Sequence, residues 1–136
     1  MEAAMQSNGI NTAGKILLMD DDASIRDVVG EMLVTLGYRV EYACDGVEAL
    51  DLFREAWRSA APFDALIMDL TIPGGMGGIE ALQQILTLDP SAKAIASSGY
   101  TNDSVFADVA EYGFRGSVAK PFRIQDLDAV LNNVVK

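Results

Sequence analysis

Five residues that could do chemistry stand at the ends of short apolar runs: Asp20, Asp21, Asp69, Ser98 and Lys120. Three carboxylates brought close together repel one another unless they are protonated or share a cation. A hard divalent ion such as Mg²⁺ suits oxygen ligands and keeps positions open for water and a phosphoryl oxygen. An ammonium and a hydroxyl match further phosphoryl oxygens, and a carboxylate can be the nucleophile that forms an aspartyl phosphate. If these side chains meet, their types predict a magnesium-dependent phosphoryl site.

Each group also has an ordinary structural role open to it. The acidic run 20–22 precedes a helical pattern, where acids favour the helix dipole and one can act as the N-cap. Asp69 and Ser98 each precede turn residues and could simply stabilise a turn. Lys120 could be a solvated surface charge. Only their joint placement favours chemistry over these alternatives.

The elements that would position these groups are strands alternating with helices. Apolar runs predict strands at 15–19, 38–43, 65–68, 92–97 and 117–119. Helical spacing of apolar residues predicts helices at 25–36, 45–57, 79–86, about 103–112 and 124–134. Such alternation is typical of an α/β fold, a doubly wound five-stranded parallel sheet with five helices. Because parallel strands end at a common edge, we expect the polar groups to converge there.

Composition excludes several classes of function. The 136 residues suit one domain, and a formal charge of −10 argues against nucleic-acid binding through this surface. The absence of histidine excludes Ser-His-Asp and Cys-His catalysis and histidine-ligated metals. The single Cys44 fits a reducing, cytoplasmic setting, and we expect its side chain to be buried. Residues 1–14 lack periodicity and are interpreted as a flexible leader or linker before a domain at 15–136.

Residues 15–135 resemble the response regulator receiver domain, the phosphoacceptor module of two-component signalling. The resemblance is carried by the order and spacing of four motifs: Leu18-Met19-Asp20-Asp21, Met68-Asp69-Leu70-Thr71-Ile72-Pro73-Gly74, Ser97-Ser98-Gly99-Tyr100 and Lys120-Pro121-Phe122. It implies a flavodoxin-like sheet with the strand order 2-1-3-4-5. It also implies a signalling module and not an enzyme, although such a domain assists its own phosphorylation and dephosphorylation.

The resemblance further implies a role for each residue of the edge. Asp69 would accept the phosphoryl group from a phosphohistidine of a partner kinase or phosphotransfer domain. Asp20 or Asp21, together with Asp69 and the backbone carbonyl of Thr71, would hold Mg²⁺. Ser98 and Lys120 would contact the phosphoryl group. Asp22 is left to cap the helix.

Three features depart from the family pattern. Ser117 stands where the family usually has a Tyr or Phe that follows the movement of the hydroxyl, with Tyr112 and Phe114 as nearby candidates to replace it. The loop 73–78 is one residue longer than usual, and its four glycines allow unusual backbone angles and mobility. Thr71 and Tyr100 occupy the positions that tune hydrolysis of the phosphoryl group.

The resemblance also predicts the partners of the chain, and two rival functions fit some of the same residues. The loop after Asp69 resembles that of C-terminal receivers of hybrid sensor histidine kinases, although a stand-alone regulator is the other origin. We expect the donor kinase to dock on the first helix around Arg26, Asp27 and Glu31, no membrane contact by this segment, and at most a weak homodimer. The rival functions are a Mg²⁺-dependent phosphohydrolase with an aspartyl-phosphate intermediate and a pseudo-receiver that only binds a protein partner.

Overall fold

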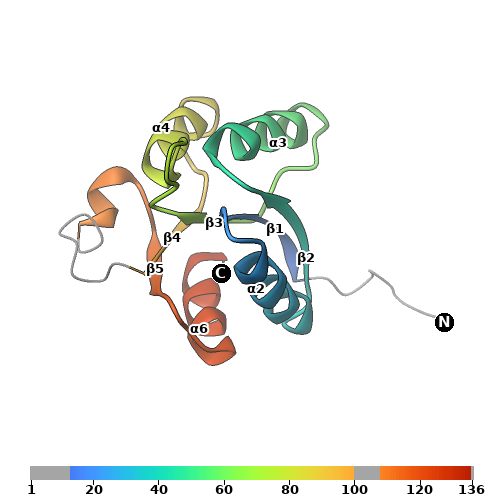
Figure 1. Cartoon of the computed structure of the whole chain (residues 1–136). Coiled ribbons are helices and arrows are strands. Elements are labelled where there is room, and N and C mark those ends of the chain that lie inside the picture. The colour runs from blue at the N-terminus through green and yellow to red at the C-terminus, as the bar shows by residue number, and fades with distance from the viewer. Residues whose placement is uncertain (1–12, 100–107, 136) are drawn as a thin grey trace.

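The computed structural model describes residues 13–99 and 108–135, which form one parallel sheet with helices on both faces (Figure 1). The strands are β1 (Gly14–Met19), β2 (Tyr38–Ala43), β3 (Ala65–Asp69), β4 (Ala94–Ser98) and β5 (Gly116–Ala119). Their order in the sheet is β2-β1-β3-β4-β5, and each neighbouring pair is parallel. The expected α/β fold class and strand order are therefore confirmed.

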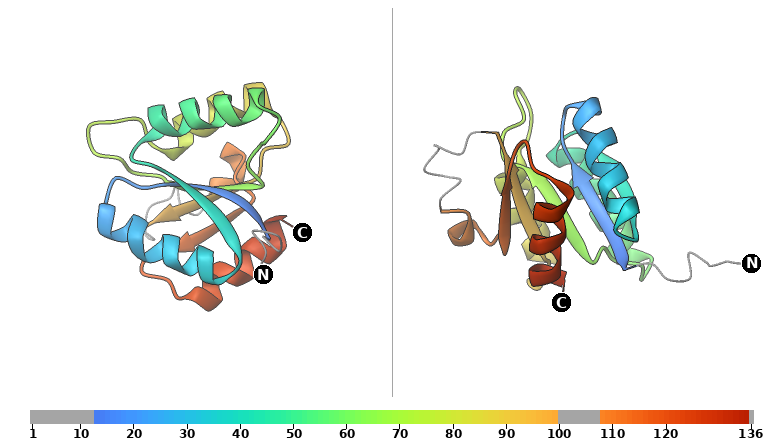
Figure 2. Two further views of the ribbon diagram at one scale, coloured as in Figure 1. Left: turned by 90° about the vertical axis from the view of Figure 1, so that its right-hand side faces the viewer. Right: turned by 90° about the horizontal axis from the view of Figure 1, so that it is seen from below.

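Two layers of helices bury the two faces of this sheet (Figure 2). One layer is α2 (Ala23–Thr35) with α6 (Ile124–Val135), and the other is α3 (Gly46–Arg58) with α4 (Gly78–Leu88). Within β3, Leu66 packs in the core on the α3–α4 side, and Ile67 packs in the core on the α2–α6 side. Burial on both faces explains why this strand is an unbroken apolar run. Among the described residues, no helix is long and apolar enough to cross a membrane.

The number of helices differs from the expected five. The described residues hold four α-helices, and where the sequence predicts a helix at about 103–112 the chain forms a short 3₁₀ helix, η1 (Val109–Tyr112). The first part of that predicted helix lies outside the described residues, as do residues 1–12 of the predicted leader. Gly113 ends η1 with a left-handed φ of 100°, which glycine adopts at no steric cost.

The start of α3 is fixed by two capping contacts and corrects the prediction made for Cys44. Asp45 caps the helix by accepting a hydrogen bond from the Glu48 amide at 2.9 Å. The Glu48 carboxylate reaches back to the amide of Cys44 at 2.7 Å, one residue earlier than in a standard capping box. Cys44 is exposed, so the expectation of a buried thiol is wrong. It lies in the turn between β2 and α3, and its contact with Glu48 raises the pKa of the thiol.

The glycine-rich loop between β3 and α4 packs closely against its surroundings. Of its four glycines only Gly74 has a positive φ, of 74°. Gly77 lies so close to the chain that a Cβ there would stand 2.5 Å from the carbonyl oxygen of Leu70. The carbonyl of Met76 accepts a hydrogen bond from the amide of Gly46, at the start of α3, at 2.8 Å. The glycines therefore permit a close backbone approach that fixes the loop following Asp69.

This packing predicts a stability effect for one glycine of the loop. Gly77→Ala should lower the free energy of unfolding by about 1–3 kcal/mol, because the new Cβ meets a backbone oxygen that cannot rotate away. Chemical denaturation monitored by circular dichroism measures the change. Gly99→Ala is the matched control, since no atom of the described residues lies within 4 Å of a Cβ there, and it should stay within about 0.5 kcal/mol of wild type. Equal stability of the two variants would contradict the close approach.

Candidate functional site

The carboxyl ends of β1, β3, β4 and β5 bring the sequence-predicted residues to one edge of the sheet. In the strand register Asp69 lies beside Ser97, and Ser98 lies beside Ala119. Asp20 directly follows β1, and Lys120 directly follows β5. The convergence expected from the parallel topology therefore occurs, between residues up to 100 positions apart in the sequence.

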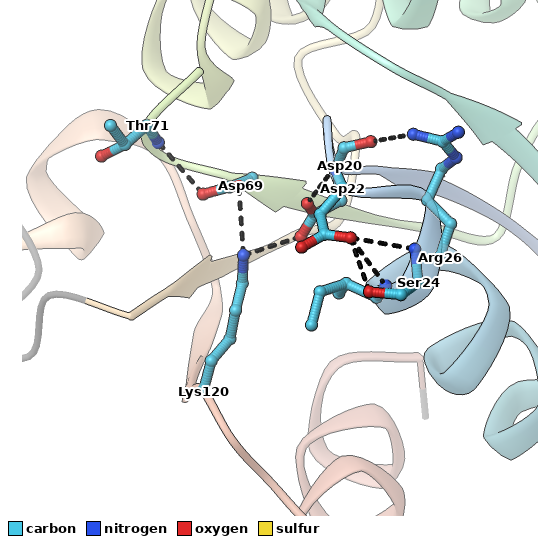
Figure 3. A network of polar contacts seen from close by, with 8 residues as sticks. Asp20, Asp22, Ser24, Arg26, Asp69, Thr71 and Lys120 are labelled. Atoms are coloured by element: carbon cyan, nitrogen blue, oxygen red, sulfur yellow. Dashed lines mark hydrogen bonds and ion pairs between the residues drawn. The ribbon is translucent and has the colours of Figure 1, made fainter. Parts of the chain in front are cut away.

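Lys120 joins two buried carboxylates at the centre of this edge (Figure 3). Its Nζ lies 2.7 Å from Oδ2 of Asp20 and 3.1 Å from Oδ2 of Asp69. Asp20 is only 2% exposed and Asp69 only 5%. Lys120 is therefore not a solvated surface charge but the cation that partly neutralises the site.

Backbone amides hold the other oxygen of each buried carboxylate. Oδ1 of Asp20 accepts from the amide of Asp22 at 2.9 Å, and Oδ1 of Asp69 accepts from the amide of Thr71 at 3.1 Å. Both turns thus fold back on the carboxylate that precedes them. Asp22 itself caps α2, as predicted, by accepting from the amide of Ser24 at 2.9 Å.

The acidic cluster fits a divalent cation. One carboxylate oxygen from each of Asp20, Asp21 and Asp69 can be chosen so that all three lie within 4.8 Å of one another. They border an open cavity of about 470 Å³, whose wall also includes Thr71 and Lys120. Three oxygen donors on one side of an open cavity suit Mg²⁺, which keeps several positions for water and phosphoryl oxygens. Thr71 belongs to the wall of this cavity, and the role of its backbone carbonyl as a Mg²⁺ ligand stays a prediction.

Burial and neighbouring charges shift the ionisation of the central pair. Burial raises the pKa of the Asp69 carboxyl; the Thr71 amide and the Lys120 ammonium oppose this, and the negative charge of Asp20 adds to it. Burial alone would lower the pKa of Lys120, but its contacts with Asp20 and Asp69 outweigh it, so the pKa is raised. Lys120 therefore stays protonated, while ionised Asp69 is held at a cost in free energy.

The other residues singled out from the sequence lie around the acidic cavity or farther from it. Ser98 is 2% exposed, and its carbonyl accepts from the amide of Lys120 at 2.9 Å, while the neighbouring Gly99 lines the cavity. Ser117 is exposed on β5. Phe114 is packed in the core on the α3–α4 side, so it is not a free ring near Ser117, and Tyr112 is 36% exposed on η1. Tyr100 lies outside the described residues.

Arg26 is a site residue that sequence reasoning placed elsewhere. Its Nη1 donates to the backbone carbonyl of Asp20 at 2.7 Å, so it is partly buried against the site and does not belong to an exposed docking face. Asp27 and Glu31 are exposed on α2, as expected. An arginine six residues after an aspartate is not a recognisable signal, because its target is a peptide oxygen that any residue carries.

The raised pKa of Asp69 predicts a pH-dependent stability difference. When the pKa of a carboxyl is higher in the folded than in the unfolded protein, the group does not affect stability below the unfolded-state pKa, because it is protonated in both states. As the pH rises from the unfolded-state pKa through the folded-state pKa, the folded protein loses stability relative to the unfolded chain. Asp69→Asn should therefore stabilise the metal-free protein at pH 7 by about 0.5–2 kcal/mol, and the gain should vanish towards acidic pH. Denaturation at several pH values in a chelator measures it.

An exposed aspartate supplies the control for this comparison. Asp51→Asn on α3 should leave stability within about 0.5 kcal/mol of wild type at every pH. If Asp69→Asn were less stable than wild type at neutral pH, the ion pair with Lys120 would outweigh the burial of Asp69, contrary to our interpretation.

Comparison with known proteins agrees with this geometry. Residues 16–132 match the response regulator receiver domain. Chemotaxis protein CheY of Thermotoga maritima is 31% identical over 123 residues, which cover 90% of this chain and 98% of that protein. Sporulation initiation phosphotransferase F of Bacillus subtilis is 33% identical over 117 residues, which cover 85% and 90% of the two chains.

A solved structure shows the same likeness together with a metal. The receiver domain of sensor histidine kinase PA1611 from Pseudomonas aeruginosa PAO1, with a magnesium ion coordinated in its active site cleft, is 28% identical. Its TM-score is 0.77, with 90% of this chain and 97% of that chain covered. The protein is a phosphoacceptor module of two-component signalling, and its acidic pocket fits both phosphorylation and Mg²⁺. The chain belongs to the response regulator receiver domain family.

Proposed function

We propose that Asp69 is the phosphorylated residue of this receiver domain. The observation that carries the proposal is the placement of its buried carboxylate at the end of β3, on the wall of the cavity and 3.1 Å from Lys120 Nζ. Asp20 is less suited to attack, because its Oδ2 is held more tightly by Lys120, at 2.7 Å. Burial also makes Asp69 more basic than an ordinary carboxylate, which favours nucleophilic attack.

In the proposed step a carboxylate oxygen of Asp69 attacks the phosphorus of a partner's phosphohistidine. A P–O bond forms and the P–N bond breaks, with its electron pair remaining on the imidazole of the partner. The Lys120 ammonium then lies beside the new phosphoryl oxygens, and the Ser98 hydroxyl is the proposed second donor. Asp20, Asp21 and Asp69, with the carbonyl of Thr71, would hold Mg²⁺, which neutralises phosphoryl charge when bound.

The two rival functions are less well supported. An aspartyl-phosphate phosphohydrolase commonly uses a carboxyl group two residues after the nucleophile as its general acid, and Thr71 stands at that position. A pseudo-receiver would have no need for Asp20, Asp69 and Lys120 to be held together by buried ion pairs. The receiver function therefore accounts for more of the site than either alternative.

Receiver domains interact with histidine kinases and phosphotransfer proteins, and we propose such a protein as the phosphodonor. The exposed face of α2 with Asp27 and Glu31 is the proposed docking surface, because α2 begins at the cavity, whose wall includes the N-cap Asp22 and Ile25 of its first turn. Similarity to a receiver domain of a sensor histidine kinase supports a hybrid-kinase origin. The cytoplasmic location and the weak homodimer stay predictions.

A small phosphodonor tests the acceptor directly. Incubation with acetyl phosphate and Mg²⁺ should add a single phosphoryl group, detected by intact mass, and the adduct should be acid-stable and base-labile as acyl phosphates are. Asp69→Asn should abolish it, and a chelator in place of Mg²⁺ should strongly reduce it.

Asp51→Asn, which removes an exposed carboxylate from α3, is the matched control and should be phosphorylated like wild type. An adduct that persists in Asp69→Asn would refute the assignment. Steady turnover of small phosphoesters by the wild type would instead favour the phosphohydrolase.

A further inference from the structure

Arg26 reaches the metal-binding turn from the first helix. Its Nη1 donates a hydrogen bond of 2.7 Å to the backbone carbonyl of Asp20, and the contact is partly buried. In Figure 3 the guanidinium of Arg26 and the ammonium of Lys120 approach Asp20 from opposite sides. The guanidinium therefore binds a neutral peptide oxygen of the turn, while Lys120 binds the carboxylate.

This contact completes the fixation of Asp20. Its amide donates to the carbonyl of Ala43 at 3.0 Å, and Oδ1 accepts from the amide of Asp22 at 2.9 Å. Oδ2 accepts from Lys120 at 2.7 Å, and the carbonyl accepts from Arg26. Every polar atom of this residue, which is 2% exposed, thus has a partner. The peptide unit that Arg26 holds is the one that joins Asp20 to Asp21, so the contact also orients the backbone that presents Asp21.

The position of Arg26 in its helix supports a specific role. It is the fourth residue after the N-cap Asp22, at the end of α2 where the helix dipole disfavours a positive charge. Its helical neighbours Asp27 and Glu31 are exposed to solvent, whereas Arg26 is turned towards the preceding strand and is only partly exposed. A cation kept at an unfavourable helix end and bound to a turn is better explained by what it holds than by the helix.

We propose that Arg26 is a positioning residue for the magnesium site: it fixes the peptide between Asp20 and Asp21 so that both carboxylates stand in place before the cation arrives. The inference rests on the proposed function, because it concerns the same metal site. Groups that orient metal ligands typically change metal affinity by about 10- to 100-fold when removed. Arg26 itself contacts neither the cation nor the phosphoryl group in this role.

The sign of the effect on metal affinity tests the proposal. Arg26→Gln removes a positive charge close to the acidic cluster. This charge repels Mg²⁺, so its loss by itself would make Mg²⁺ bind more tightly. Loss of positioning should instead weaken Mg²⁺ binding about tenfold, measured by isothermal titration calorimetry at fixed ionic strength. Arg26→Lys, whose ammonium can still donate to the carbonyl of Asp20, should weaken it less. Arg39→Gln removes the same charge from an exposed residue of β2 and should leave the affinity unchanged.

Amide hydrogen exchange in the metal-free protein gives a second readout. In Arg26→Gln the amide of Asp22, which is bonded to Asp20 Oδ1, should lose protection relative to the amides of β3. Unchanged or tighter Mg²⁺ binding by Arg26→Gln, or unchanged protection at Asp22, would overturn the positioning role alone. Failure of the wild type to bind Mg²⁺ would overturn the proposed magnesium site and this inference together.

Discussion

The structure of the site depends on mutual repulsion between carboxylates that the fold brings together. Asp20 and Asp69 are both almost fully buried, and Asp21 stands close enough to share a cation with them. Ionised groups in such surroundings need a compensating charge. Lys120 supplies it from a strand end 100 residues from Asp20 and 51 residues from Asp69. Burial raises the pKa of the Asp69 carboxyl despite the contact with Lys120. Three carboxylates beside one ammonium also leave negative charge that a second cation would neutralise.

Lys120 also links the site to the neighbouring strands of the domain. Lys120 contacts Asp69 through its side chain and Ser98 through its backbone amide, so it joins the end of β3 to the ends of β4 and β5. Beyond it, β5 and α6 border an open hollow of about 430 Å³, whose wall includes Ser117 and Ala129. Ser117 contributes only a small side chain to this hollow, at the position where the family resemblance predicts an aromatic ring, and Phe122 lines the hollow beside it.

Backbone packing fixes the approaches to the site as firmly as the ion pairs do. Arg26 and the amide of Asp22 hold the turn after β1, and the amide of Thr71 holds the turn after β3. The glycine loop that follows is tied to α3 through the carbonyl of Met76. The carboxylates thus occupy positions set by their own turns, and the cavity between them remains open for a ligand.

The sequence by itself determined the strands, their parallel arrangement and the edge at which the polar groups meet. These features follow from apolar periodicity and from the alternation of strands with helices, which patterns of a few neighbouring positions reveal. The order of the strands and the choice of Asp22 as the cap came from the resemblance to the receiver family. The tertiary structure decided which carboxylate oxygens Lys120 joins, that Arg26 binds a peptide carbonyl, that Cys44 is exposed and that a 3₁₀ helix replaces part of a predicted α-helix. These outcomes depend on contacts between distant segments and on packing, and no local pattern of residues encodes them.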